Sequence, residues 1–268
     1  KRMTQQILSR ILINTGITKE QVDAAYDCQI IKSCLILQMS RYDQKAFQKR
    51  KDFKYVVAKN LTVVPKLMFC KCFNLELIYA PNVQRIEDGF SEDNYGYGSF
   101  SQTAITDISF PKLLYAGVLA FFACQKAINV DLPRCEKLAE SAFEWCTSVQ
   151  VMKLSCVRSV GIWCFNCCTS MTELVLPYLY SDSNIENCIS QCTSMQLIKC
   201  KLAASQFKCT VKDCSCPVCA KEIEICLQRG NTKQTLAQTP QRSDFSAIHL
   251  LCKNLMSNQQ QETIQSNS

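Results

Sequence analysis

The chain has 268 residues, of which 47% are hydrophobic, so it can bury a sizeable core. Its formal net charge is +7, but the whole basic excess lies in residues 1–59 and residues 60–268 are neutral. A neutral body excludes an extended electrostatic surface for nucleic acid over most of the chain, so no nucleic-acid partner is expected. No membrane span is expected either, because no apolar run approaches the ~18 residues that a membrane helix needs.

The first 52 residues are predicted to form a helical cap. Gly16 is expected to end a first helix over residues 5–14. Thr18 followed by Gln21 has the spacing of a capping box, which predicts a second helix from residue 19. An apolar stripe at helical spacing extends this second helix to residue 34. Together the helices are expected to cover the open end of the repeats that follow.

Residues 41–55 interleave basic side chains with aromatic ones. Such a pattern is compatible with binding to nucleic acid or to acidic lipid. A solvated helix face or linker is the favoured interpretation, because charge runs usually face water.

From about residue 53 the sequence repeats itself. Phe143 follows Phe121 by 22 residues (143 minus 121), and Phe165 follows Phe143 by the same interval. A fixed period of this size predicts a solenoid. Less regular copies extend the pattern over residues 53–208, which gives about six units, and the acidic insertion at residues 87–99 lengthens one of them. Two further columns keep the interval: Cys124, Cys146 and Cys168, and Leu132, Leu154 and Leu176.

Each unit ends in two apolar residues that are two positions apart, which is strand spacing. In one unit these are Met152 and Leu154, with Lys153 between them. One short strand per repeat is therefore predicted, stacked in parallel on its neighbours, with Lys153 pointing outward. The cysteine column is expected to point inward as small buried hydrophobic side chains.

These units resemble BspA-like (Treponema-type) leucine-rich repeats, whose pattern is close to I-x-x-x-A-F-x-x-C-x-x-L-x-x-I-x-L-P. Ala120, Phe121, Cys124, Leu132 and Pro133 lie on that pattern. The resemblance covers somewhat more than half of the chain. It implies an α/β repeat solenoid, a leucine-rich-repeat stack of short parallel strands with an N-terminal helical cap, used for adhesion or interaction. Cysteine-rich versions of these repeats are common in anaerobic protists.

Residues 209–228 are predicted to form a cysteine-rich C-terminal cap. Four thiolates in this segment are candidate zinc ligands, since zinc accepts four sulfur atoms in a tetrahedron. They are crowded along the chain, however, whereas structural zinc sites usually join two well-separated pairs. Reduced thiols or a disulfide are therefore expected here, with no metal and no cofactor. The four candidates are Cys209, Cys214, Cys216 and Cys219.

Residues 229–268 are polar and predicted to be mostly disordered, with a short amphipathic helix over residues 244–256. This helix contains His249, the only histidine of the chain. Without a phosphate-binding loop or paired carboxylates at recurring offsets, the sequence does not indicate an enzyme.

A monomeric protein-interaction scaffold with an unidentified protein partner is the favoured function. Two alternatives remain open, a secreted or cell-surface adhesin held by disulfides and a zinc-containing nucleic-acid adaptor. We expect a cytoplasmic location, or a surface or secreted one if a signal peptide lies upstream of Lys1. The outward residues of the strands are the predicted partner-binding strip, and these are Tyr79, Ser109, Asp131, Lys153, Val175 and Lys199.

Overall fold

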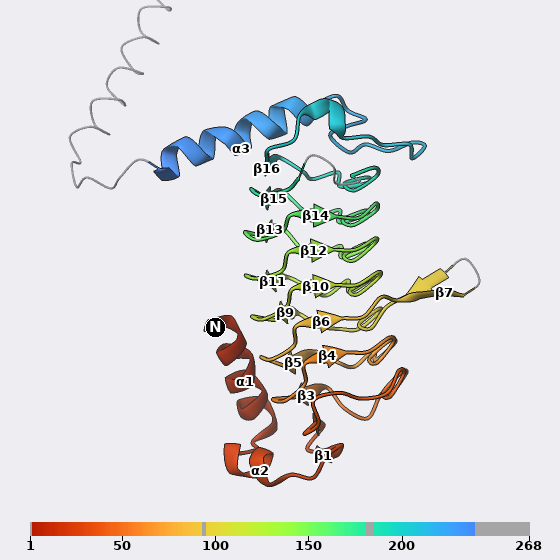
Figure 1. Ribbon diagram of the computed structural model, residues 1–268, viewed down its shortest axis with the longest axis vertical. Coiled ribbons are helices and arrows are strands. Elements are labelled where there is room, and N and C mark those ends of the chain that lie inside the picture. Colours follow the sequence, from red (N-terminus) through yellow and green to blue (C-terminus); the bar gives the residue numbers. More distant parts are fainter. Residues whose placement is uncertain (1, 93–94, 181–184, 239–268) are drawn as a thin grey trace, which may run out of the picture. The chain divides into compact units, whose positions relative to one another are not determined.

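The computed structural model describes residues 2–92, 95–180 and 185–238. It divides into two compact units, Lys1–Asn231 and Thr232–Ser268, and the first unit holds the repeats. The first unit is a stack of parallel strands, as the repeat pattern predicts (Figure 1).

One column of strands runs along the stack. Met152 lies opposite Leu174, and Leu174 lies opposite Ile198, so equivalent positions of successive repeats are in register. The column confirms the predicted parallel stacking of the strands. Its members are β3 (Tyr55–Val57), β5 (Leu77–Tyr79), β9 (Asp107–Ser109), β11 (Asn129–Asp131), β13 (Val151–Lys153), β15 (Glu173–Leu176) and β16 (Leu197–Cys200).

A second column of two-residue strands runs beside the first. The prediction of one strand per repeat was therefore wrong. Strands this short carry only one inward residue each, such as Leu138 or Val160. They therefore lack the alternation of apolar and polar residues by which a strand is predicted from sequence. The members of this column are β4 (Val63–Val64), β6 (Arg85–Ile86), β10 (Tyr115–Ala116), β12 (Lys137–Leu138) and β14 (Ser159–Val160).

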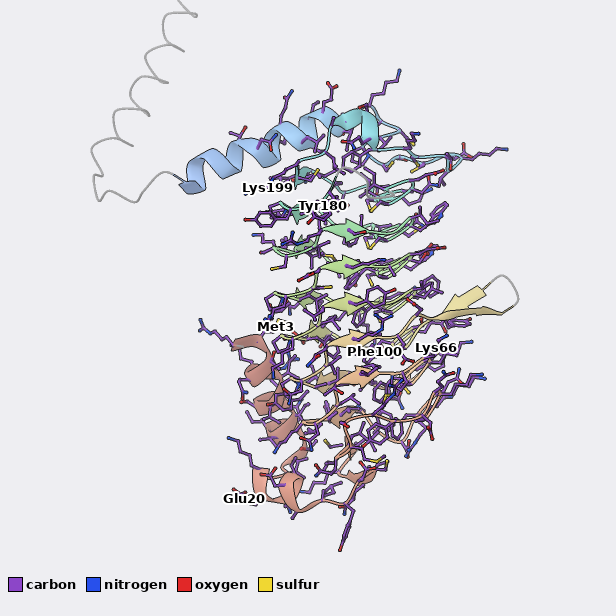
Figure 2. All side chains as sticks on the ribbon, in the orientation of Figure 1. Met3, Glu20, Lys66, Phe100, Tyr180 and Lys199 are labelled. Carbon is purple, nitrogen blue, oxygen red and sulfur yellow. The ribbon has the colours of Figure 1, made fainter. Side chains whose placement is uncertain are left out.

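The phenylalanine column fills the interior of the coil. The Phe143 ring stacks between those of Phe121 and Phe165, with centroid distances of 5.0 and 6.2 Å, and all three side chains are fully buried. Phe100 continues the same column (Figure 2). Leu119 and Ala123, which flank Phe121, have φ of 58° and 56°, so the chain turns sharply on both sides of the ring. The predicted buried aromatic column is confirmed.

The cysteine column lies beside the phenylalanines and is fully buried, which confirms its predicted position. Each thiol donates a hydrogen bond to the carbonyl of the phenylalanine one turn earlier. Cys146 Sγ lies 3.3 Å from the Phe121 oxygen, and Cys168 Sγ lies 3.2 Å from the Phe143 oxygen. Cysteine therefore satisfies a backbone carbonyl inside the coil while it fills the volume of a small apolar side chain.

The solenoid begins before residue 53, which corrects the predicted boundary of the cap. The Phe47 ring stacks on that of Phe69 at 5.6 Å, so Phe47 belongs to the aromatic column. The basic stretch around it is an early turn of the coil rather than a helix. β2 (Cys34–Ile36) already pairs in parallel with β3.

The predicted second helix is shorter than expected. α2 (Lys19–Ala24) begins with the predicted capping box of Thr18 and Gln21 but ends ten residues before residue 34 (34 minus 24). β1 (Gln29–Ile31) and β2 follow as an antiparallel hairpin. Lys32 and Ser33 at its tip have φ of 46° and 64°, a conformation that neither residue type signals in a sequence.

The insertion predicted before Phe100 forms a hairpin of its own. β7 (Phe90–Glu92) and β8 (Tyr95–Tyr97) pair antiparallel, with Phe90 opposite Tyr97. Figure 1 shows the hairpin leaving the stack at the height of β6. The repeats on either side of it therefore keep their stacking.

At the C-terminal end of the repeats, a 3-10 helix (Ala204–Gln206) and α3 (Ile223–Gln238) follow β16. Ile223, Cys226 and Leu227 are buried in the main core, so the start of α3 covers the last turn. α3 continues past residue 228, where the sequence predicted disorder to begin. The helix predicted over residues 244–256 lies outside the described residues.

Candidate interaction surface and cysteine centre

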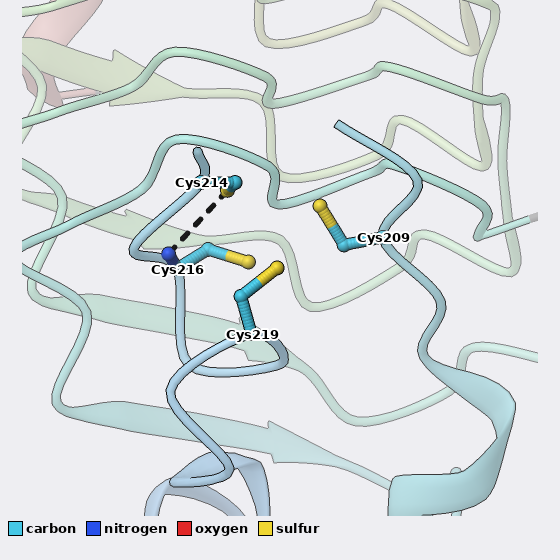
Figure 3. Close-up of side chains that lie close together, drawn as sticks. All are labelled: Cys209, Cys214, Cys216 and Cys219. Carbon is cyan, nitrogen blue, oxygen red and sulfur yellow. Dashed lines mark hydrogen bonds between the residues drawn. The ribbon is translucent and has the colours of Figure 1, made fainter. Parts of the chain in front are cut away.

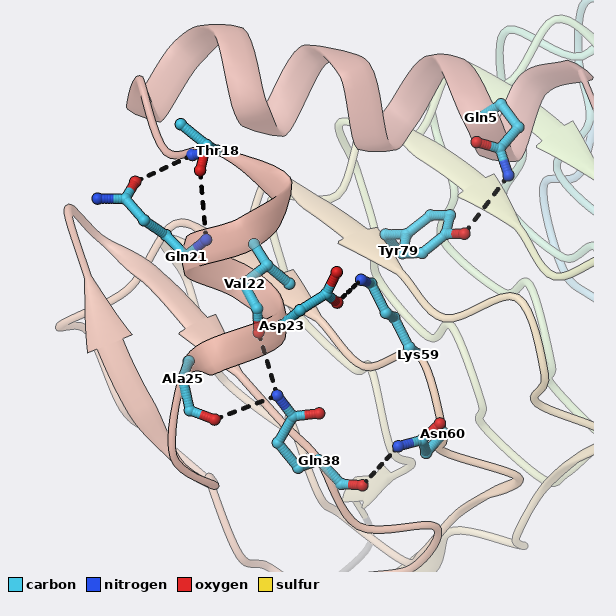
Figure 4. Close-up of polar contacts among 10 residues, drawn as sticks. All are labelled: Gln5, Thr18, Gln21, Val22, Asp23, Ala25, Gln38, Lys59, Asn60 and Tyr79. Atoms are coloured by element: carbon cyan, nitrogen blue, oxygen red, sulfur yellow. Dashed lines mark hydrogen bonds and ion pairs between the residues drawn. The ribbon is translucent and has the colours of Figure 1, made fainter.

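The N-terminal helix α1 (Arg2–Thr15) lies against the strand column at β5 and β9. The predicted helix is thus present. It was expected to cover the open end of the stack, but it lies along the side, on β5 and β9. Ile7 and Ile11, one helical turn apart, are buried against Leu77 and Tyr79. Gln5 Nε2 donates a hydrogen bond of 3.4 Å to the Tyr79 hydroxyl (Figure 4).

Polar contacts also fix α1 on β9. Arg10 Nη1 lies 2.7 Å from Asp107 Oδ2, and Thr4 Oγ1 lies 2.7 Å from Ser109 Oγ. Burial raises the pKa of the Asp107 carboxyl, but hydrogen bonds from Thr106, Asn129 and Arg10 outweigh that effect, so its pKa lies below its ordinary value. Asp107 is therefore held as a buried carboxylate under the helix.

α2 is fixed to the first turns by polar contacts of the same kind (Figure 4). Lys59 pairs with Asp23 of α2. Gln38 Nε2 donates to the carbonyl oxygen of Val22 at 3.1 Å and to that of Ala25 at 3.3 Å. The N-terminal segment is thus bonded to the repeats at both of its helices.

The helix α1 covers two of the six residues predicted to bind a partner. Tyr79 is 7% exposed and Ser109 is 0% exposed, so neither belongs to the free surface. No pattern around either residue shows that a segment from the distant N-terminus lies on them. The free part of the predicted strip starts at Asp131.

The open strip runs over β11, β13 and β15, and we define it by Asp131, Val151, Lys153, Glu173 and Val175. Lys153 is exposed, and its Nζ lies 3.6 Å from Glu173 Oε1. Val151 is 40% exposed, unusually open for an aliphatic strand residue. The predicted residue Lys199 lies outside this strip, because Gly230 of α3 packs on the backbone of Ile198 and Lys199 in β16. The open strip therefore carries both signs of charge around an apolar centre.

A groove of about 620 Å³ opens beside the start of α1 and was not predicted. Thr4 of α1 forms one wall, and the loops that follow β5, β9 and β11 form the other. Arg134 lies on the loop after β11, next to the beginning of the open strip. The sequence signal for this groove is the proline that ends each strand: Pro81, Pro111 and Pro133.

The four candidate metal ligands come together after the last repeat (Figure 3). The sulfur atoms of Cys209, Cys214, Cys216 and Cys219 all lie within 4.8 Å of one another. Their close spacing in the sequence therefore does not prevent the four sulfur atoms from converging. Asp213, with φ of 52°, turns the chain between Cys209 and Cys214. Cys216 is buried, whereas Cys219 is exposed.

Backbone amides point at these sulfur atoms. The Gln191 N–H donates to Cys214 Sγ at 3.2 Å, and the Cys216 N–H donates to the same atom at 3.4 Å. Burial raises the pKa of the Cys214 thiol, but these hydrogen bonds outweigh burial, so the pKa lies below its ordinary value. For Cys216 burial prevails and the pKa is raised, although the Cys219 and Val218 amides oppose the shift.

The repeats match a family model described as a BspA type leucine-rich repeat region, over residues 4–96 and 93–211. The chain belongs to this family. Its BspA-type coil is similar to that of a leucine-rich repeat protein from Bacteroides ovatus, with 16% identity over 65% of this chain and 61% of the other, and a TM-score of 0.44. A leucine-rich repeat protein from T. pallidum is similar at 18% identity over 65% of this chain and 67% of that one, with a TM-score of 0.38.

A third similar structure is a leucine-rich cell surface protein from Faecalibacterium prausnitzii, at 16% identity over 60% of this chain and 63% of the other, with a TM-score of 0.35. This chain thus spans less than two thirds of the length of the Bacteroides and Faecalibacterium proteins. No curated protein matches the sequence. Within the described part of the chain, no helix has both the length and the apolar character that crossing a membrane requires.

Proposed function

We propose that this BspA-type protein is a non-enzymatic scaffold that binds an amphipathic helix of a partner protein along the open strip. The observation that carries the proposal is the position of α1 on the same column of strands. A helix of this chain already uses β5 and β9 as its docking surface, and the open strip is the continuation of that surface over β11 to β15.

The dimensions of helix and stack favour this arrangement. A helix rises about 5.4 Å per turn, and neighbouring strands lie about 4.8 Å apart. A helix that runs along the stack therefore brings roughly one turn to each strand. α1 follows this rule, since Asn14 contacts Tyr55 of β3 at one end and Thr4 contacts Ser109 of β9 at the other.

The residues of the open strip indicate which side chains a partner helix should carry. Val151 and the half-buried Val175 offer an apolar centre for one or two aliphatic or aromatic side chains. Lys153 favours an acidic residue on the partner, and Asp131 favours a basic residue at the end nearest α1. The surface thus suits an amphipathic helix with charges of both signs on either side of its apolar stripe.

A selection of helical peptides displayed on phage tests the proposal with the intact protein as bait. Peptides that bind the native chain should be amphipathic, and they should lose about tenfold or more in affinity when Asp131 and Lys153 are both changed to Ala, given the ~1.4 kcal/mol that each tenfold represents. The melting temperature should change little, because Lys153 is exposed and the half-buried Asp131 accepts only one long hydrogen bond, of 3.4 Å, from Ser109.

The matched control is the pair Glu136→Ala and Lys137→Ala, which lies at the second strand column of the neighbouring turn. Peptides should bind this variant as they bind the native protein. Equal affinity for all three proteins, or loss only in the control, would place the binding surface elsewhere.

A further inference from the structure

The separation of the sulfur atoms in the cysteine centre fits a bound metal ion. In a tetrahedral zinc site each sulfur lies about 2.3 Å from the metal, which places the sulfur atoms ~3.8 Å from one another. The four atoms here lie within 4.8 Å of one another, so a small inward movement would close the tetrahedron. Each of the four residues supplies one thiolate, which matches the ligand number of a structural zinc site.

The surroundings of the sulfur atoms also fit thiolate ligands. Cys214 Sγ accepts two backbone N–H groups, from Gln191 and Cys216, and the Ser190 hydroxyl lies 3.0 Å from Cys209 Sγ. Hydrogen bonds of this kind orient metal ligands and stabilise their negative charge. Ser190 and Gln191 belong to the last repeat, so their hydrogen bonds to the sulfur atoms connect the cysteine segment to the coil.

The segment that carries these cysteines lacks other sources of stability. Residues 207–222 contain no helix or strand, although they connect the last turn of the coil to α3. Within this segment, Phe207 and Cys216 are among the few buried apolar side chains. Short segments with so small a core usually depend on a metal or on disulfides for their structure.

We propose that Cys209, Cys214, Cys216 and Cys219 bind one structural zinc ion that fixes the C-terminal cap on the last repeat. Four protein ligands leave no open position, so the ion serves structure rather than catalysis. On binding, the four thiols release their protons and form four zinc–sulfur bonds, without any change in oxidation state.

Metal analysis of the intact protein, purified under reducing conditions, tests this proposal. We expect one zinc per chain. Replacement by Co²⁺ should give the strong visible absorption of tetrahedral thiolate coordination. The variants Cys214→Ser and Cys216→Ser should lose the metal and the absorption. Cys28→Ser and Cys156→Ser change thiols outside the centre and should keep both.

Chelation supplies a second measurement that does not depend on a variant. Removal of zinc from the native protein should make residues 207–222 sensitive to protease, whereas the repeats stay resistant. Peptide binding at the open strip should persist, which separates this proposal from the proposed function. The proposal would be overturned if the protein held no stoichiometric zinc or held one iron per chain in its place. Disulfides among the four cysteines in the reduced preparation would also overturn it.

Discussion

The guanidinium of Arg10 on α1 and the carboxylate of Asp107 on β9 lie 2.7 Å apart and join two positions 97 residues distant in sequence. The two partners differ in environment, because the Arg10 side chain is 49% exposed and that of Asp107 is 7% exposed. Asp107 also accepts a hydrogen bond of 2.8 Å from Asn129. The carboxylate thus organises one end of the α1 docking surface, and the arginine covers it.

This asymmetry gives the first prediction. Asp107→Ala should lower the free energy of unfolding by about 2 kcal/mol, since it removes a buried charged acceptor that takes hydrogen bonds from Thr106, Asn129 and Arg10. Arg10→Ala should cost at most about 1 kcal/mol, as is usual for an exposed partner. Urea denaturation at neutral pH measures both. Glu76→Ala, which removes the exposed pair with Lys54, is the control and should change little.

The pH dependence has a definite sign. The pKa of Asp107 is lowered in the folded protein, so its contribution is complete above the unfolded pKa of about 4 and is lost as the pH falls below that value. Native protein should therefore lose more stability than Asp107→Ala between pH 5 and pH 2. Parallel curves for the two proteins would contradict the assignment of a buried carboxylate.

The second prediction concerns the aromatic column. Phe143→Ala should cost about 3–5 kcal/mol, because the fully buried ring stacks on both neighbours and truncation leaves a cavity. Trp145→Ala, two residues away and 44% exposed, should cost less than about 1 kcal/mol. Chemical denaturation of the two variants gives the comparison, and similar losses would show that the ring column does not carry the core.

The regular part of the coil was predictable because each repeat places the same position in the same environment. Phe121, Phe143 and Phe165 keep their interval since each ring must stack on the next. Phe47 has the same interval to Phe69 (69 minus 47), but its repeat has Arg50 in the cysteine column and lies in a basic stretch. The basic residues of this stretch therefore led to the interpretation as a linker or helix face, although the 22-residue interval alone identifies the repeat that contains Phe47.

Other features leave no trace in the sequence. The sharp turns use residues such as Leu119 and Trp145 at positive φ, where glycine would have been the usual signal. The burial of Tyr79 depends on the N-terminal helix, whose Gln5 lies 74 residues earlier in the sequence. The convergence of four sulfur atoms depends on where the backbone turns, which cysteine spacing alone does not determine.

The third prediction tests the close approach of neighbouring turns. A side chain at Gly161 would place its Cβ 2.4 Å from the backbone nitrogen of Glu140, and the Gly161 N–H is itself bonded to the Leu138 oxygen at 2.9 Å. Gly161→Ala should therefore cost about 1–3 kcal/mol, in the range of overpacked sites. Ser159→Ala, on the adjacent strand, should be nearly neutral. A neutral Gly161→Ala in thermal or urea unfolding would show that the turns can separate freely.

The last prediction concerns the reactivity of the buried thiols. Burial raises the pKa of the Cys146 thiol well above its ordinary value, and the thiol donates to the Phe121 carbonyl. Since the thiolate is the reactive form, Cys146 should resist alkylation in the folded protein at pH 8 and react fully once urea unfolds the chain. Cys124, whose pKa burial raises to about 11, should behave in the same way.

Cys156 is the internal control, because its side chain is partly exposed and it lies outside the column. Pulsed alkylation with peptide mass spectrometry should label Cys156 within the native state. The labelling of Cys146 and Cys124 should instead follow the unfolding curve, because both residues become accessible only when the stack opens. Native-state labelling of Cys146 at the rate of Cys156 would mean that adjacent turns open locally, and the cysteine column would then not be part of the cooperative core.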